Sequence, residues 1–336
     1  MAAPRVALTI VACALPALMI AASGVQAQAH GGRQLPPTGL DLYIPAPVGT
    51  PSREAIALGR LLFFDPVLSR DSTVACVTCH HPARAFTDGK RLAEGVQGRP
   101  GKRNSPTVLN RGYGTSFSWD GRTNLLESQV LRAIQDPVEM DLALDSAVQR
   151  LARHRVYAVA FQALRKQQPS ADAIAGVLAD YVRSIRGGDS PFDRFSAGDE
   201  SALTPLARRG LALFQGRARC DRCHSGSLLS DEQFHNTGVA WRNGVLLDAG
   251  RNLVSGRTED RGAFKTPTLR EIASTAPYMH DGSLATLEEV VDFYDRGGTP
   301  NPHLDHRIRP LRLTADEKAA LLEFLRALSG KVREGW

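Results

Sequence analysis

Two short segments combine two cysteines with a histidine at the spacing C-x-x-C-H. Cys76, Cys79 and His80 form the first motif, and Cys220, Cys223 and His224 form the second. In such a motif the two thiols attach a haem through thioether bonds and the histidine ligates its iron. A single copy would also be compatible with a zinc knuckle or a redox dithiol. The two copies use all the cysteines beyond residue 29, so we expect two covalently bound haem c groups rather than a disulfide or a separate zinc cluster.

The ligands of the two irons decide what such a chain does. If protein side chains close both irons, the chain is an electron carrier. If one iron keeps an open face, the chain is an enzyme that can bind a small oxidant there.

An internal repeat places the two motifs at equivalent positions of two modules. An apolar segment that ends at Phe63 precedes the first motif, and a similar segment that ends at Phe214 precedes the second. Three further pairs of segments match, namely 105–109 with 266–269, 119–121 with 280–282, and 178–187 with 321–330. We therefore expect a mainly α protein of two cytochrome c-like haem domains that arose by internal duplication.

Capping residues mark the starts of three expected helices. These residues are Thr204, Thr286 and Thr314. Strand-like alternation is scarce, so we expect short hairpins at most. A glycine-rich polar stretch between Gly187 and Ala202 interrupts the helical pattern. We place the domain boundary there, with an N-terminal domain at 30–195 and a C-terminal domain at 196–336.

The first 29 residues have the pattern of a secretory signal peptide. Arg5 precedes an apolar run at 6–22, and the small residues at 27–29 fit a cleavage site. A lipoprotein signal ending at Cys13 is the alternative, although the apolar run before it is short. No later segment is apolar enough to cross a bilayer. We therefore expect a periplasmic protein without a membrane span.

The charge pattern gives no sign of a nucleic-acid partner. The formal net charge is +6 without haem, and the propionates of two haems would cancel about four positive charges. The arginines are scattered and aromatic side chains that could stack on bases are few.

The two modules differ at one position that could ligate a metal. Tyr294, near the end of the helix that follows Thr286, corresponds to Ala133 in the first module. If this position reaches its haem, the tyrosine oxygen closes the second iron and the first iron stays open. The alternative is that Tyr294 is an ordinary core residue of an amphipathic helix.

The first module also contains Trp119, Gln129 and Glu139, at intervals of ten residues. An apolar stripe from Leu125 to Ile134 predicts a helix that ends before Pro137, which places Glu139 in the turn beyond it. A carboxylate beside an open haem can move a proton from one peroxide oxygen to the other. Gln129 could orient peroxide, and Trp119 could carry electrons between haems. Each residue alone could equally be a surface carboxylate, a solvated amide or a packed indole.

Together these segments resemble the bacterial di-haem cytochrome c peroxidase and MauG family. The resemblance covers residues 55–330 and rests on both haem motifs and on the segments 117–122, 136–140 and 276–282. It implies that Trp119 lies between the haems and that Gln129 and Glu139 belong to the peroxide pocket. It also implies a calcium ion between the haems. The residues at the corresponding calcium positions are Asn104, Thr275 and Pro277, the last two through backbone carbonyls.

Two departures from the classical family pattern favour the MauG-like branch, and a third residue argues against full identity with MauG. The chain has no histidine from Pro82 to Asn110, where classical members carry one that blocks the first iron. Tyr294 stands where classical members have a methionine ligand, although Met140 and Met279 are rival ligands. Ala218 stands where MauG has a surface tryptophan that carries electrons. Trp241 and Trp336 are other candidates for that task, and the alternative is that they are packing or tail residues.

We expect a periplasmic di-haem peroxidase that reduces hydrogen peroxide at the open haem. Its electrons would come from a small cytochrome c or cupredoxin through the second haem. One alternative is a MauG-like oxidant that uses peroxide to modify side chains of a partner protein. The alternative of another class is a non-enzymatic di-haem electron carrier.

Overall fold

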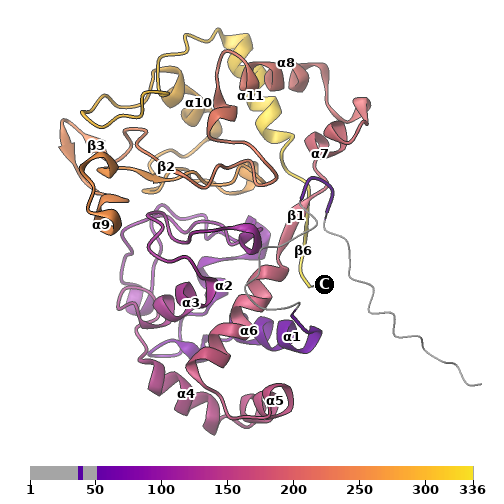
Figure 1. Cartoon of the computed structure of the whole chain (residues 1–336), viewed down its shortest axis with the longest axis vertical. Helices are drawn as coiled ribbons and strands as arrows, with labels where there is room; N and C mark the ends of the chain where they lie inside the picture. Colours follow the sequence, from indigo (N-terminus) through magenta and orange to yellow (C-terminus); the bar gives the residue numbers. More distant parts are fainter. Residues whose placement is uncertain (1–36, 41–50, 336) are drawn as a thin grey trace, which may run out of the picture. The chain divides into compact units, whose positions relative to one another are not determined.

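The computed structural model describes residues 37–40 and 51–335. The predicted signal peptide at residues 1–29 and the candidate Trp336 lie outside the described residues. The described residues belong to one compact unit and are mainly helical, as Figure 1 shows.

The α-helices in the described part of the chain are α1 (Arg53–Phe64), α2 (Cys76–Cys79), α3 (Leu126–Gln135), α4 (Leu144–Arg153), α5 (Arg155–Arg165), α6 (Ala171–Ser184), α7 (Pro191–Ser196), α8 (Pro205–Gln215), α9 (Asn252–Ser255), α10 (Leu287–Asp295) and α11 (Ala315–Arg326). The strands are β1 (Arg186–Gly188), β2 (Phe234–His235), β3 (Trp241–Arg242), β4 (Val245–Leu246), β5 (Phe264–Lys265) and β6 (Lys331–Arg333). The 3₁₀ turns are η1 (Pro66–Leu68), η2 (Pro82–Arg84), η3 (Val96–Gly98), η4 (Arg111–Tyr113), η5 (Glu200–Ala202), η6 (Cys220–Arg222), η7 (Thr258–Asp260) and η8 (Ile272–Ser274).

The same helix crossing occurs once in each half of the molecule. Helix α1 packs on α6, and helix α8 packs on α11. A Cβ atom at Gly59 of α1 would lie 1.9 Å from the carbonyl oxygen of Val177. A Cβ atom at Gly210 of α8 would lie 2.0 Å from the carbonyl oxygen of Ala320. Both crossings therefore need glycine, because only a residue without Cβ lets the backbones approach this closely.

An aromatic pair forms the centre of each core at equivalent positions. The rings of Phe63 and Tyr181 lie 5.0 Å apart in the first half, and those of Phe214 and Phe324 lie 5.1 Å apart in the second. Both pairs meet edge to face, as aromatic rings prefer. This correspondence supports the predicted duplication, which stays a prediction.

In the described part of the chain, the strands form two-stranded ladders. Only β3–β4 is a short hairpin, so the prediction of short hairpins at most is wrong for the other two ladders, which join distant segments. Strand β1 pairs with β6, β2 with β5, and β3 with β4, all antiparallel. The β1–β6 ladder joins the end of the first half to the end of the chain, with Gly187 opposite Val332. The capping threonines predicted from the sequence are confirmed at the starts of α8, α10 and α11.

The predicted apolar stripe on α3 is wrong at its first residue. Leu125 precedes the helix in extended conformation, and its side chain is exposed. It occupies the N-cap position, so its side chain does not share the face that buries Leu126 and Ile134. Asp136 ends the helix as predicted.

No described helix is both long and apolar enough to cross a membrane. The boundary predicted between residues 195 and 196 falls at the end of α7 and stays a prediction.

Candidate functional site

The first motif occupies the one-turn helix α2 and the residue that caps it. The Thr78 hydroxyl accepts the N–H of Ala75, which fixes the start of the turn. The Nδ1 atom of His80 lies 3.2 Å from the carbonyl oxygen of Phe86. Because a carbonyl only accepts, Nδ1 carries the hydrogen and Nε2 keeps its lone pair. Burial lowers the pKa of His80. The neutral imidazole is therefore ready to ligate iron through Nε2.

The second motif repeats this arrangement. Cys220 begins the turn η6, and the backbone N–H of His224 donates to the carbonyl oxygen of Cys220 at 2.9 Å. The Nδ1 atom of His224 lies 3.0 Å from the carbonyl oxygen of Leu229, and burial lowers its pKa as well. Both histidines thus present Nε2 as a free ligand atom.

The cysteines of the two motifs are half-buried and not joined in disulfides. Burial raises the pKa of Cys76 to about 12, that of Cys79 to about 11 and that of Cys220 to about 12. Such surroundings disfavour a thiolate. These surroundings therefore favour neutral thioether bonds to haem over a zinc site, which would need thiolate ligands.

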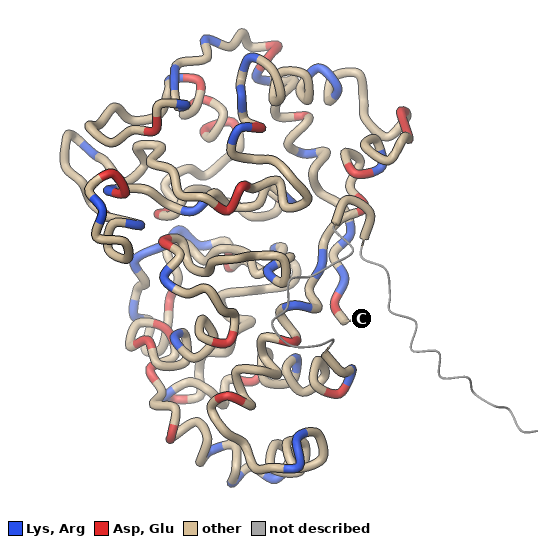
Figure 2. Tube along the Cα trace, in the orientation of Figure 1, with Lys and Arg blue, Asp and Glu red and all other residues tan. Residues whose placement is uncertain are grey.

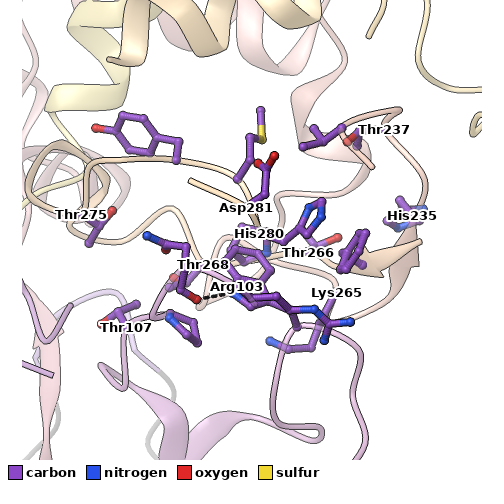
Figure 3. A pocket seen from close by; sticks show the side chains of 18 of the residues that line it. Arg103, Thr107, His235, Thr237, Lys265, Thr266, Thr268, Thr275, His280 and Asp281 are labelled. Atoms are coloured by element: carbon purple, nitrogen blue, oxygen red, sulfur yellow. Dashed lines mark hydrogen bonds between the residues drawn. The ribbon is translucent and has the colours of Figure 1, made fainter. Parts of the chain in front are cut away.

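One cavity of about 1280 Å³ borders both motifs. Figure 3 shows part of its wall, with Arg103, Lys265 and His280. Residues from both halves line it, including His80 and His224. Apolar walls, two histidines with free Nε2 atoms and four free thiols are what covalently attached haems require, so the residues present fit these groups.

Trp119 lies where the two halves meet. Its indole N–H donates to the carbonyl oxygen of Asn104 at 2.8 Å. The carbonyl oxygen of Trp119 accepts the N–H of Lys265 at 2.8 Å. Its ring lies 6.5 Å from that of His280, the equivalent residue of the second half. The cavity wall includes Trp119, as its predicted place between the haems requires.

Gln129 lines the cavity from helix α3. Its carbonyl oxygen accepts the hydroxyls of Ser118 at 2.8 Å and Thr123 at 3.0 Å. These two contacts fix the amide and leave its NH₂ group as the part that can donate to a molecule in the cavity.

Glu139 lies in the turn beyond α3, as predicted. Its N–H donates to the carbonyl oxygen of Asp136, and its carbonyl oxygen accepts the N–H of Val96. The carboxyl group is accessible from the cavity and surrounded by protein elsewhere. Burial, and next the negative charge of Asp136, raise its pKa to about 7. A carboxyl group with this pKa can both accept and return a proton near neutral pH.

Residues 82–139 contribute much of the first half's share of the cavity wall. Among its described residues, the wall segment contributed by residues 82–139 contains no histidine, methionine or tyrosine. Gln129 and Glu139 lie there instead. This composition supports the prediction that the first iron has an open face.

Tyr294 lines the cavity from helix α10. Burial, and next the nearby Cys220, raise the pKa of its phenol. Of the rival ligands, Met279 also lines the cavity, whereas Met140 lies in the first core. The placement therefore leaves Tyr294 and Met279 as candidates for the second iron.

The three residues predicted to bind calcium all line the cavity. Asn104 is buried, and its side-chain NH₂ donates to the carbonyl oxygen of Lys90 at 2.8 Å, which leaves the amide oxygen for a cation. Its backbone N–H donates to the carbonyl oxygen of His280. This bond holds Asn104 against the segment that contains Thr275 and Pro277.

Buried charges of the cavity wall were missed from the sequence. Arg103 pairs with Asp248 at 2.8 Å and with Asp120 at 2.6 Å. A second cluster consists of Lys265, Glu232 and Arg111, in which Arg111 binds both carboxylate oxygens of Glu232 at 2.8 Å. Burial lowers the pKa of Lys265 to about 7. The repeated Asp-Gly pairs at 120–121 and 281–282 were the only local signal for any of these residues.

Comparison with known proteins gives consistent matches. The family model of di-haem cytochrome c peroxidase matches residues 53–201. The methylamine utilization protein MauG of Methylorubrum extorquens is 40% identical over 291 residues, which cover 86% of this chain and 82% of that protein. The cytochrome-c peroxidase IdrP1 of a Pseudomonas species is 36% identical over 344 residues, which cover 93% and 89%.

A solved structure is similar over most of its length. The crystal structure of a MauG-like protein associated with microbial copper homeostasis matches with a TM-score of 0.81 and 34% sequence identity. The match covers 87% of this chain and 95% of that one.

Proposed function

Because the chain belongs to the di-haem cytochrome c peroxidase family, we propose that it reduces hydrogen peroxide at an open haem held by His80, with electrons passing through a second haem held by His224. Its relatives are named as peroxidases and MauG proteins, so the chain is a di-haem oxidoreductase with two c-type haems. Neither of these two relatives is named as a non-enzymatic electron carrier, so they give no support to that alternative.

The position of Glu139 on the cavity wall that also includes Gln129 is the observation that carries the proposed reaction, and its pKa of about 7 suits the transfer of a proton. When bound, the haems supply iron that takes peroxide at an open position and exchanges electrons one at a time. Glu139 accepts the proton of one peroxide oxygen and returns it to the other, which leaves as water. The NH₂ group of Gln129 holds peroxide in place while this proton moves.

Trp119 and Tyr294 serve the transfer of electrons. Trp119 lies at the meeting of the two halves and provides an oxidisable ring between the haems. Tyr294 would hold the second iron through its phenol oxygen, and an anionic oxygen ligand would favour the oxidised states of iron. The cations Arg103 and Lys265 on the cavity wall would hold the haem propionates by ion pairs.

Two sources of electrons fit this reaction. A small cytochrome c or cupredoxin would make the chain a scavenger of peroxide, whereas side chains of a partner protein would make it a MauG-like oxidant. The similarity to MauG favours the second source. The first is favoured by Ala218, which is a buried alanine where MauG has its surface tryptophan.

The proposal also includes a calcium site and a periplasmic location. Asn104 and the carbonyl oxygens of Thr275 and Pro277 bind one calcium ion beside the haems, and equilibrium dialysis against calcium with an Asn104→Ala control tests this site. The predicted signal peptide directs the chain to the periplasm.

Stopped-flow absorption spectroscopy tests the proposed function. The fully oxidised protein is mixed with one equivalent of hydrogen peroxide. An immediate change in the spectra of both haems is the expected result, because the first iron is open and the two haems share electrons. If no change occurs until one haem has been reduced, a ligand blocks the first iron and the proposal of a haem open at rest fails.

A further inference from the structure

The two halves differ in chemistry at the aromatic pair that forms the centre of each core. Tyr181 on α6 corresponds to Phe324 on α11, and each packs against the equivalent phenylalanine of its own half, Phe63 or Phe214. A phenol can lose one electron together with one proton, whereas a phenyl ring is much harder to oxidise. The first half, which holds the haem proposed to react with peroxide, therefore contains an oxidisable ring that the second half lacks at this position.

One ring separates Tyr181 from the proposed iron ligand His80. The ring of Tyr181 lies 5.0 Å from that of Phe63 and meets it edge to face. The ring of Phe63 in turn lies 6.5 Å from the imidazole of His80. Tyr181 is 0% exposed and Phe63 is 2% exposed. The path from the phenol to the first haem therefore runs through closely packed side chains, which single electrons can cross.

The phenol of Tyr181 also has a carboxylate in place to take its proton. Its hydroxyl donates to Oε2 of Glu334 at 2.6 Å, a short bond of the charge-assisted kind. Burial, and next the hydrogen bond to Glu334, raise the pKa of the phenol, so the resting side chain keeps its proton. A phenol that has lost an electron is instead a strong acid. The side chain of Glu334 is 28% exposed, so the carboxylate can pass the proton on to solvent.

Contacts with the first half hold the segment that carries Glu334. The Nε atom of Arg60 on α1 donates to the same carboxylate oxygen at 3.0 Å. The N–H of Gly335 donates to the hydroxyl of Ser184 on α6 at 3.3 Å. Figure 1 shows this end of the chain beside α6, and Figure 2 shows charged residues of both signs along it. The fold therefore fixes the carboxylate beside the phenol.

A second buried phenol in the same core provides a comparison. The hydroxyl of Tyr157 donates to a carboxylate oxygen of Asp65 at 2.5 Å, so this phenol also has a proton acceptor. Its ring packs against that of His154 at 5.0 Å rather than against Phe63. Tyr157 thus has the acceptor but not the chain of rings that leads to His80.

We propose that Tyr181 is a redox-active residue that supplies one electron to the first haem when no external donor is bound, and that Glu334 takes its proton. This inference rests on the proposed function, because hydrogen peroxide is the oxidant. In this step the O–H bond of Tyr181 breaks, the electron reduces the iron that peroxide has oxidised, and the proton moves to Glu334. A neutral tyrosyl radical is left in the core until a reductant returns one electron and one proton.

Electron paramagnetic resonance tests the role of Tyr181. The oxidised protein with both haems is mixed with one equivalent of hydrogen peroxide and no donor, and samples are frozen at increasing times. We expect a radical that grows as the oxidised haem spectrum decays. Its signal should narrow in protein made with ring-deuterated tyrosine, which identifies it as a tyrosyl radical. Tyr181→Phe should remove the radical and prolong the oxidised haem state, whereas Tyr157→Phe should do neither.

The role of Glu334 is tested through the rate of radical formation. Glu334→Gln keeps a hydrogen-bond partner for the phenol but does not take its proton, so the radical should form at least about tenfold more slowly. Glu334→Asp should restore part of the rate. In the wild type, D₂O should slow the same phase. This phase follows the consumption of peroxide, so the isotope effect reports the proton of the phenol rather than the proton moved by Glu139.

Other results would overturn the inference in distinguishable ways. Haems that react with peroxide without any tyrosyl radical contradict the role of Tyr181 while the proposed function stands, and so does a radical that persists in Tyr181→Phe. Equal rates in the wild type and Glu334→Gln would show that the contact only anchors the end of the chain. Haem spectra that do not respond to peroxide at all would overturn the proposed function and this inference together.

Discussion

The indole N–H of Trp119 donates a 2.8 Å hydrogen bond to the carbonyl oxygen of Asn104. The N–H of Asn104 in turn donates to the carbonyl oxygen of His280 in the second half. The ring proposed to carry electrons between the haems is thus fixed by a residue that also ties the two halves together. A substitution at this junction should slow electron transfer between the haems more than it slows the reaction of the first haem with peroxide.

Trp119→Phe should therefore separate the two haems electronically. Phenylalanine fills most of the space, but it is much harder to oxidise and lacks the N–H. In the stopped-flow experiment, we expect the first haem to respond to peroxide and the second to respond at least about tenfold more slowly. Trp241→Phe is the control and should leave this first phase unchanged. A wild-type response of both haems in Trp119→Phe would show that electrons take another route.

Glu139→Gln should remove the proton transfer and keep the shape of the pocket. We expect the rate with peroxide to fall by about 10² to 10⁴. The wild-type rate should rise as pH increases through about 7, because the carboxylate is the form that accepts a proton and its pKa is raised to about 7. The variant should be slow at every pH between 5.5 and 8.5. Glu288→Gln, an exposed change on α10, should behave like the wild type.

The raised pKa of Glu139 also affects the stability of the fold. As pH rises, the rate with peroxide should increase but the stability should decrease. A carboxyl group whose pKa is higher in the folded than in the unfolded state makes folding less favourable as pH rises between the two values. For Glu139 these values are about 7 and 4.5. In urea unfolding, the stability of Glu139→Gln relative to the wild type should increase between pH 4.5 and about 7. A constant difference across this range would contradict the raised pKa.

The ligand of the second iron is distinguished by potentiometry. Tyr294→Met should raise the reduction potential of the second haem, because a thioether ligand stabilises reduced iron relative to an anionic oxygen. Met279→Leu should leave that potential unchanged if Tyr294 is the ligand. The reverse pattern, with a shift in Met279→Leu and none in Tyr294→Met, would identify Met279 as the ligand.

Local signals explain which parts of this molecule could be predicted from sequence. The haem motifs, the threonine caps and the end of α3 at Asp136 each depend on a few neighbouring residues, and all are found as expected. Leu125 was misplaced because apolar spacing does not distinguish a cap from the first helical turn. The pair of Arg103 with Asp248 spans 145 residues and could not be read from any local pattern. In the sequence, the only sign of the close helix crossing at Gly59 was the glycine at the equivalent position of the second module, Gly210.

The buried cluster around Glu232 makes the last prediction. Burial alone would raise the pKa of Glu232, but the hydrogen bonds and charge of Arg111 outweigh it and lower the pKa to about 2. Its ionised form therefore stabilises the fold above pH 4.5, and this contribution is lost as pH falls from 4.5 toward 2. Glu232→Gln leaves Arg111 and Lys265 buried without a counter-charge, which should cost about 3–5 kcal/mol of unfolding free energy at pH 7. Glu259→Gln removes an exposed ion pair with Arg257 and should cost no more than about 1 kcal/mol. Denaturant unfolding of the two variants at pH 7 measures both values, and equal losses would show that the buried cluster contributes no more than a surface pair.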